Sequence, residues 1–220
     1  MIVITGASDG LGLQLAKLYK EAGKKVVNVS RNKSKFADVN ISLSLREGAE
    51  IEKAARQVAD IDEPVEAIVF CAGVESLEEL GKITEDEIKR LMSTNVKSQI
   101  LLTSFLIDRI EKDSSDIVCV SSTSGTKGVP GHIVYSSSKW AVRGFAQNLQ
   151  ASFKDKPNRV ISFVPGGFKS DIVKKVNGQD LENPDEWMDA EYVALFIKQI
   201  LDLPKNMEVS EVIINRKQPK

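Results

Sequence analysis

The stretch Met1-Ile2-Val3-Ile4-Thr5-Gly6-Ala7-Ser8-Asp9-Gly10-Leu11-Gly12 decides the fold of this 220-residue chain. Its first five residues are mostly β-branched and predict a strand, its glycines predict a turn, and Leu11, Leu15 and Leu18 recur at helical spacing. Glycines let backbone amides approach a pyrophosphate closely, and the helix N-terminus adds partial positive charge. A plain helix N-terminus is the alternative to a dinucleotide phosphate site. The candidate contacts of such a site are Gly6, Ser8, Asp9, Gly10, Leu11 and Gly12.

Short apolar runs alternate with helical patterns along the rest of the chain. Further strands are expected at Lys25–Ser30, Val39–Leu43, Val65–Phe70, Asp116–Val120, Arg159–Val164 and Val209–Asn215. Further helices are expected at Glu47–Ala59, Thr84 to about Arg109, Val134–Phe153 and Glu191–Leu203. Strands that alternate with helices form right-handed crossovers, which build a mostly parallel sheet covered on both faces. The pattern predicts an α/β fold, a single doubly wound domain over residues 1–220 with a seven-stranded sheet.

The composition is that of an ordinary globular chain and argues against several classes of function. Hydrophobic residues make up 42% and charged residues 28%, and 30 basic against 31 acidic side chains leave a net charge of -1. This balance gives no support to a surface for nucleic acid or for an anionic membrane. The apolar runs are shorter than the roughly 20 residues that span a bilayer, and the start lacks the basic head of a signal peptide. We therefore expect a cytoplasmic protein whose partner is a small molecule.

The chain has few residues suited to a metal site or a disulfide. Cys71 and Cys119 are the only cysteines, and His132 is the only histidine. Both cysteines lie in apolar, strand-like runs, and this position predicts buried free thiols. We therefore expect no metal site.

The end of the second predicted strand, Ser30-Arg31, bears on the choice of dinucleotide. In dinucleotide-binding folds this strand end meets the adenosine ribose, where an acidic residue would bind the 2′-hydroxyl of NAD. A hydroxyl and a guanidinium suit the 2′-phosphate of NADP instead. The pair favours NADP(H). NAD(H) remains possible, because Asp9 could repel the phosphate and because Arg31 could be an ordinary solvated charge.

The stretch Ser122–Lys139 carries the candidate chemistry. Tyr135 and Lys139 are four residues apart, so on a helix both side chains lie on one face. A positive charge beside a phenol favours the phenolate and lowers the pKa of the tyrosine, which could then exchange a proton with a carbonyl or an alcohol. Taken alone, the pair also fits an exposed tyrosine and lysine without a catalytic role.

Taken together, these residues resemble those of the classical short-chain dehydrogenase/reductase superfamily over essentially the full length of the chain. Thr5–Gly12 is similar to the family's cofactor turn, and Tyr135-x-x-x-Lys139 is similar to its catalytic pair. Ser122 lies thirteen residues before Tyr135, which is the family's usual spacing and distinguishes it from Ser121 as the catalytic serine. The resemblance implies a Rossmann-type fold.

Further positions match the family's pattern. Asn95 resembles the family's helix asparagine, and Cys71-Ala72-Gly73 resembles its Asn-Ala-Gly element with Cys in place of Asn. Pro165-Gly166-Gly167 and Ser170 resemble the segment that contacts the nicotinamide and the phosphates. These positions add to the expected cofactor contacts Cys71, Ala72, Gly73, Tyr135, Lys139, Pro165, Gly166, Gly167 and Ser170.

The resemblance implies an NAD(P)-dependent oxidoreductase. During reduction Tyr135 would donate its proton to the forming alkoxide, Ser122 would bind the carbonyl oxygen, and Lys139 would lower the pKa of Tyr135 and hold the ribose. Asn95 would support a water relay behind Lys139. We therefore expect NADPH-dependent, reversible reduction of a carbonyl to an alcohol on a small-molecule substrate, by a homodimer or homotetramer.

Two features leave the ligands partly open. The aspartate that many members place after the third strand, near the adenine, corresponds to Ser42 or Asn40. The expected substrate loop, residues of about 168–189, is short and polar. A 3-oxoacyl thioester reductase and a non-catalytic dinucleotide-binding regulator on the same fold are the alternatives. An epimerase or dehydratase of nucleotide-sugars would need a longer C-terminal substrate domain.

Overall fold

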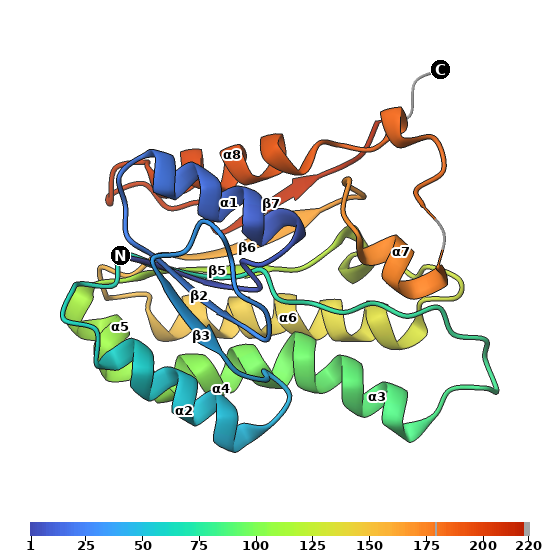
Figure 1. Cartoon of the computed structure of the whole chain (residues 1–220), viewed down its shortest axis with the longest axis horizontal. Coiled ribbons are helices and arrows are strands. Elements are labelled where there is room, and N and C mark those ends of the chain that lie inside the picture. The colour runs from blue at the N-terminus through green and yellow to red at the C-terminus, as the bar shows by residue number, and fades with distance from the viewer. Residues whose placement is uncertain (179, 218–220) are drawn as a thin grey trace.

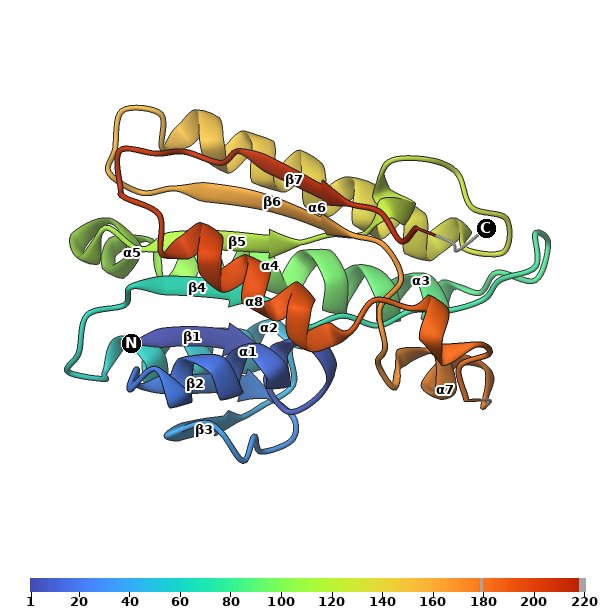
Figure 2. The same ribbon diagram turned by 90° about the horizontal axis from the view of Figure 1, so that it is seen from above.

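The computed structural model, which describes residues 1–178 and 180–217, is built around one parallel sheet. Within the described residues seven strands lie in the order β3-β2-β1-β4-β5-β6-β7, as Figure 2 shows from above, and each neighbouring pair is parallel. The strands are β1 (Ile2–Thr5), β2 (Val26–Ser30), β3 (Val39–Ser42), β4 (Ala67–Phe70), β5 (Asp116–Val120), β6 (Val160–Pro165) and β7 (Glu211–Ile214).

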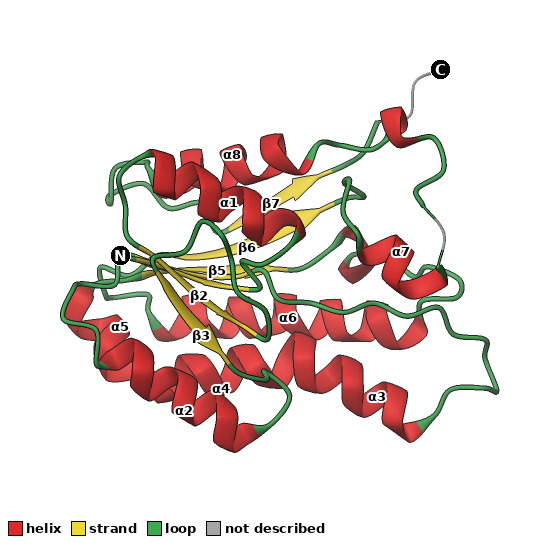
Figure 3. Ribbon diagram, in the orientation of Figure 1, coloured by secondary structure: helices red, strands yellow, loops and turns green. Residues whose placement is uncertain are grey.

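Helices cover both faces of this sheet (Figures 1 and 3), which confirms the predicted doubly wound α/β fold. One face carries α1 (Gly10–Glu21) and α8 (Ala190–Leu201). The other face carries α2 (Gly48–Ala59), α3 (Glu85–Met92), α4 (Ser98–Phe105), α5 (Ile107–Asp113) and α6 (Ile133–Ser152). Other short helical elements include α7 (Ile172–Asn177), which lies beyond the carboxyl ends of the strands, and the 3₁₀ turns η2 (Thr123–Gly125) and η3 (Pro184–Glu186).

The apolar strands account for two hydrophobic cores, one on each side of the sheet. Ile4 packs in one cluster with Leu15 of α1 and Ile197 of α8. Val3 packs in the other cluster with Ile51 of α2. Successive side chains of a strand point to opposite faces, so a strand buried on both sides must be apolar at every position. This requirement explains why the central strands β1, β4 and β5 could be located as largely apolar runs.

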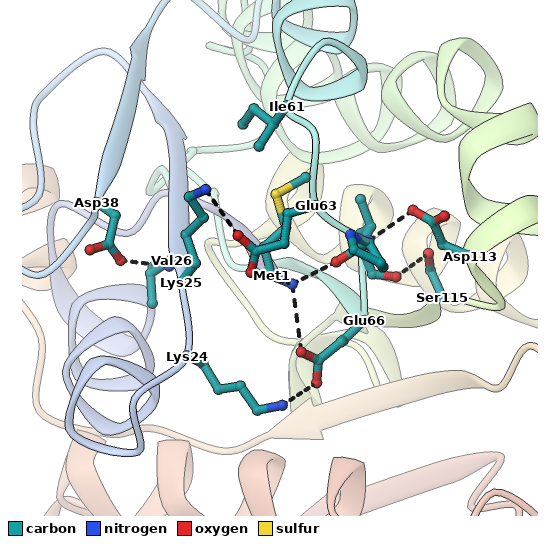
Figure 4. Close-up of polar contacts among 12 residues, drawn as sticks. Met1, Lys24, Lys25, Val26, Asp38, Ile61, Glu63, Glu66, Asp113 and Ser115 are labelled. Carbon is teal, nitrogen blue, oxygen red and sulfur yellow. Dashed lines mark hydrogen bonds and ion pairs between the residues drawn. The ribbon is translucent and has the colours of Figure 1, made fainter.

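The amino-terminal edge of the sheet is held by a polar cluster around Met1 (Figure 4). The buried Met1 donates from its ammonium to the carbonyl oxygen of Pro64, 2.6 Å away. The carboxylates of Glu63 and Glu66 lie 3.5 and 3.6 Å from the same nitrogen, and both also pair with the lysines that precede β2. These contacts fasten β1 to the segment before β4.

The helix predicted from Thr84 to about Arg109 is interrupted twice. A π-helical turn, η1 (Ser93–Lys97), separates α3 from α4, and α4 ends before α5 begins at Ile107. A π-turn accommodates one extra residue in a helix and often occurs at a functional site. Here it contains Asn95, whose buried side chain binds a neighbouring loop.

The strand order reverses at β1, because β2 lies on one side of β1 and β4 on the other. Thr5 at the end of β1 is in register with Val29 of β2 and Phe70 of β4, so the loops that follow these strands start at one edge. Ligands of open parallel sheets bind outside the carboxyl ends of the strands at such a reversal.

Among the described residues, no helix combines the length and apolarity needed to cross a membrane.

Candidate active site

A cavity of about 680 Å³ lies at the carboxyl edge of the sheet. This volume is within the usual range for sites that bind small molecules. Every residue predicted to bind the cofactor or to act on the substrate lines it, except Gly12 and Asn95. The cavity is therefore the candidate active site.

The turn between β1 and α1 forms one wall of the cavity and is closely packed. Gly6 has a φ of +71°, a conformation that favours glycine, and a Cβ at this position would lie 2.9 Å from the Cα of Ala72. Gly12 lies behind the turn, where a Cβ would come within 2.4 Å of the carbonyl oxygen of Gly6. Gly12 thus packs against the turn and does not line the cavity. The N-terminus of α1 brings partial positive charge to this wall.

Asp9 is the N-cap of α1 and is held at both of its carboxylate oxygens. One oxygen accepts from the amide of Gly10 at 2.6 Å, and the other pairs with Lys175 of α7. These two contacts hold the side chain of Asp9 in place. Lys175 also offsets the negative charge that could repel a phosphate.

The far end of the cavity, beside β2 and β3, carries two arginines. Arg31 and Arg46 are both exposed and both line the cavity. Ser30 also lines it, but its buried hydroxyl donates within the β2–β3 connection, with the carbonyl oxygen of Asn32 as an acceptor at 2.7 Å. The guanidinium groups are therefore better placed than Ser30 to meet an anion. Sequence reasoning missed Arg46, since it follows β3 in an irregular segment.

The prediction that Ser42 or Asn40 replaces the family's adenine-side aspartate is wrong. Asn40 serves the β2–β3 connection, where its Oδ1 accepts from the amide of Ser34 at 2.7 Å. Ser42 ends β3 and is exposed, and neither residue lines the cavity. The wall at this end is formed by the next segment, with Ser44 and Leu45.

Ser122, Tyr135 and Lys139 meet in the cavity from two elements. Ser122 follows β5, and Tyr135 and Lys139 lie one turn apart on α6. The Lys139 ammonium lies 5.7 Å from the centre of the Tyr135 ring and donates to the carbonyl oxygen of Val120 at 3.1 Å. The hydroxyl of Ser121 is buried and donates to the carbonyl oxygen of Lys139 at 2.8 Å. The end of β5 and the first turns of α6 are thus bonded together.

The ionisation of these groups differs from the sequence-based expectation. Burial raises the pKa of Tyr135, the carboxylate of Glu75 raises it further, and a hydrogen bond with Ser122 opposes the shift. Burial also lowers the pKa of Lys139 to about 8. The prediction that Lys139 pulls the pKa of Tyr135 down is therefore wrong for this structure. Desolvation outweighs the attraction, because both groups are buried in a low-dielectric environment.

Asn95 lies behind the cavity and binds the loop that follows β4. Its Oδ1 accepts from the amide of Val74 and its Nδ2 donates to the carbonyl oxygen of Val74, both at 2.8 Å. Its Nδ2 also donates to the hydroxyl of Ser138 at 2.9 Å. A Cβ on Gly73 would lie 3.6 Å from both the Oδ1 of Asn95 and the Nζ of Lys139. Asn95 therefore positions the loop next to Lys139.

The cavity is also lined by aromatic side chains and by a carboxylate beside an imidazole. Phe168 and Trp187 line it, and the Trp187 ring packs so closely on Gly167 that a Cβ there would lie 2.5 Å from the ring. Glu75 and His132 also line it, with 3.1 Å between Oε1 of Glu75 and Nδ1 of His132. Sequence reasoning did not pair these two residues, because they lie on separate segments.

Trp140 of α6 contributes little to the hydrophobic core. It is 49% exposed, and the Cζ of Arg143 lies 5.4 Å from the centre of its ring.

Cys71 and Cys119 are free thiols, and burial raises the pKa of each to about 12. The described part of the chain contains no group of three or more His, Cys, Asp and Glu side chains that could hold a metal.

Comparison with known proteins shows similarity along the chain. Residues 1–181 match the family model described as short chain dehydrogenase. An uncharacterized oxidoreductase of Listeria monocytogenes is 25% identical over 235 residues, which cover 97% of this chain and 95% of the relative. A short-chain dehydrogenase/reductase from Vibrio parahaemolyticus has a crystal structure with a TM-score of 0.84 at 27% identity, covering 99% of this chain and all of that one. The closed form of a serine dehydrogenase complexed with NADP+ shares the fold, with a TM-score of 0.87 at 21% identity and coverage of 97% and 94%.

Proposed function

Because the chain belongs to the short chain dehydrogenase family, we propose that it reversibly reduces a carbonyl group of a small molecule to an alcohol with NADPH. One observation carries this proposal. Ser122, Tyr135 and Lys139 line the same cavity as the glycine turn. A proton donor and a hydride donor can act on one carbonyl only when they share such a space.

The cavity residues fit a dinucleotide. The cavity extends from Arg31 and Arg46 past the glycine turn to Tyr135. The N-terminus of α1 and the hydroxyl of Ser170 would hold the pyrophosphate, and Lys139 would hold the nicotinamide ribose. A nicotinamide dinucleotide bound along this path would supply the hydride for reduction or accept it for oxidation.

The burial of Tyr135 suits it to donate a proton in the reductive direction. Its raised pKa keeps the phenol protonated, and the hydroxyl of Ser122 would bind the carbonyl oxygen as negative charge develops there. Lys139, with a pKa of about 8, can carry or release a proton near neutral pH, so it would return a proton to Tyr135 after turnover. Asn95 would keep the loop after β4 in place beside this relay.

A preference for NADPH over NADH is supported by the charges at the β2 and β3 end. Arg31 and Arg46 offer two cations to a 2′-phosphate, and Lys175 offsets the charge of Asp9. An Arg–phosphate bond is charge-assisted and can be bidentate, so it selects the phosphorylated ribose. The serine dehydrogenase of similar fold was solved with NADP+, which agrees with this choice.

The test is a screen of the purified protein for NADPH oxidation with aldehydes, ketones, quinones and 3-oxoacyl thioesters. We expect turnover with at least one class and its loss in Tyr135→Phe. Tight NADPH binding without turnover of any class would instead favour the non-catalytic regulator.

We also propose that a second copy of the chain covers part of α8. Tyr192, Leu195 and Phe196 lie within five residues of one another on α8 and are at least 36% exposed. Clustered exposed apolar side chains are typical of association surfaces. Light scattering after size-exclusion chromatography should give the mass of a dimer or tetramer, and Tyr192→Asp should lower it. A monomeric mass for the unmodified chain would contradict this proposal.

A further inference from the structure

The Glu75 carboxylate lies on the substrate side of the cavity, next to the proposed proton donor. Its side chain is only 18% exposed and lines the cavity together with His132. The His132 ring lies 6.1 Å from the Tyr135 ring, between centroids. The Glu75 charge raises the pKa of Tyr135, so the two groups interact electrostatically. A ligand carbonyl bound at Tyr135 would therefore have this carboxylate as a neighbour.

The pairing of Glu75 with His132 is not required to hold the loop that carries Glu75. Glu78 already fastens this loop to the start of α6, since its carboxylate accepts from the amide of Val134 at 3.3 Å and its amide donates to the carbonyl of Gly131 at 2.8 Å. Arg90 binds the backbone carbonyl of Glu75 at 3.0 Å. The side chain of Glu75 is thus left to face the cavity.

The surroundings of this carboxylate leave it poorly solvated. Burial raises the pKa of Glu75, and the charges of His132 and Lys139 oppose that shift. The Nδ1 of His132 lies 3.1 Å from Oε1 but is not aligned for a hydrogen bond. The indole N–H of Trp187 donates to the carbonyl of Glu182, at 3.1 Å, and is engaged there. A largely buried carboxylate that accepts no hydrogen bond from a side chain or amide of the described residues gains strongly from a donor that enters the cavity.

The neighbouring walls limit what that donor can be. Leu77 and Phe168 line the cavity and offer apolar contacts, and the Arg90 guanidinium, which also lines it, is paired with the Glu87 carboxylate. A ligand with a second anionic group near its carbonyl would meet repulsion from Glu75, whereas a hydroxyl or an ammonium group would bind it. The site therefore favours substrates whose group beside the carbonyl is a hydrogen-bond donor and disfavours those in which it is an anion.

We propose that Glu75, paired with His132, is a specificity-determining residue that binds a hydroxyl or ammonium group on the carbon beside the substrate carbonyl. This inference rests on the proposed carbonyl reduction at Tyr135. It narrows the substrate class to α-hydroxy and α-amino carbonyl compounds and their alcohols. It makes a plain 3-oxoacyl thioester, which carries no such donor, a poor substrate.

The test compares three ketones of similar size with NADPH: α-hydroxyacetophenone, α-aminoacetophenone as its ammonium ion, and propiophenone. We expect the unmodified protein to prefer the two donor-bearing ketones over propiophenone by roughly ten to a hundredfold in kcat/KM, the range of a hydrogen bond to a charged group. Glu75→Gln should lose most of this preference, most of all for the ammonium ion. Glu79→Gln is the matched control, because Glu79 lies in the same loop but does not line the cavity, and it should keep the preference.

The outcomes separate this inference from the proposed function. If the ketones are reduced without a preference, or if Glu75→Gln keeps it, the inference is overturned and the reductase activity stands. If none is reduced, calorimetric binding of α-hydroxyacetophenone and propiophenone to the NADPH-loaded protein decides the matter. Tighter binding of the hydroxyketone that is lost in Glu75→Gln supports the inference, and equal affinities overturn it.

Discussion

Lys139 donates a hydrogen bond from Nζ to the carbonyl oxygen of Val120, 3.1 Å away at the end of β5. This bond holds the ammonium in a buried position, where desolvation lowers its pKa from 10.5 to about 8. A lysine whose pKa is lower in the native than in the unfolded state destabilises the fold at low pH, because the native state disfavours the charge. The lysine that serves the proposed chemistry therefore costs stability.

Lys139→Met should reveal this cost as a pH dependence. Between pH values of about 8 and 10.5, Lys139 binds more protons in the unfolded chain than in the native chain. The free-energy cost of burying its ammonium is therefore complete below about pH 8 and is lost as the pH rises through this range. The stability of Lys139→Met relative to the unmodified protein should fall by ~3 kcal/mol from neutral pH to about 10.5. Urea unfolding of both cofactor-free proteins across this range measures the difference. Lys154→Met, at an exposed lysine outside the cavity, is the control, and an equal trend in it would contradict the assignment.

Tyr135→Phe should keep the fold and NADPH binding but lose most turnover, because the substitution removes only the phenolic oxygen. General acid catalysis contributes about 10²- to 10⁴-fold, and kcat should fall within that range. The measurement is kcat with the best carbonyl substrate together with the Kd for NADPH. A variant that retained half of the original kcat would exclude Tyr135 as the proton donor.

Ser30→Asp combined with Arg31→Ala should shift the preference from NADPH toward NADH. The double variant removes a cation and adds a carboxylate, which suits the free 2′-hydroxyl of NAD and repels a 2′-phosphate. Loss of one charge-assisted bond should weaken the binding of NADPH by roughly ten- to a hundredfold. The measurement is kcat/KM for both cofactors at one ionic strength, with Arg46→Ala assayed in parallel. If the unmodified protein already prefers NADH, the cofactor proposal fails while the catalytic assignment survives.

Gly12→Ala should destabilise the protein and weaken NADPH binding. The added Cβ would lie 2.4 Å from the carbonyl oxygen of Gly6, so the glycine turn would have to shift. Overpacking of this kind costs about 1–3 kcal/mol. Gly144→Ala on α6 is the matched control, because no described atom beyond its own stretch of helix lies within 4 Å of its added Cβ and alanine favours a helix by about 0.5–1 kcal/mol. Equal unfolding midpoints for the two variants would show that the turn is not closely packed.

Much of the fold could be predicted because β1, β2, β4, β5 and β6 are buried on both faces. Asp116–Val120 was predicted as a strand and is β5 with the same bounds. The glycine turn could be placed because a strand and an amphipathic helix flank it. The π-turn at Asn95 could not be predicted, because one inserted residue hardly changes the apolar spacing of a helix.

The site could be predicted where short motifs carry it and not where loops bring distant residues together. Glu75 and His132 are 57 residues apart, and only the path of two loops pairs them. The pKa of Tyr135 was predicted in the wrong direction, because the spacing to Lys139 gives a neighbour but not the degree of burial. Electrostatic predictions from spacing alone therefore omit the desolvation that dominates here.

The buried bond from Ser121 to the backbone of Lys139 has a consequence for mutational scanning. Alanine at Ser121 would cut the link between a strand and a helix, whereas alanine at Ser122 would remove a hydroxyl that faces the cavity. Two adjacent serines would then both score as essential in an activity assay, for unrelated reasons. In a melting curve the change at Ser121 should cause the larger loss, because the Ser122 hydroxyl only caps the short turn η2 by accepting from the amide of Ser124 at 3.2 Å.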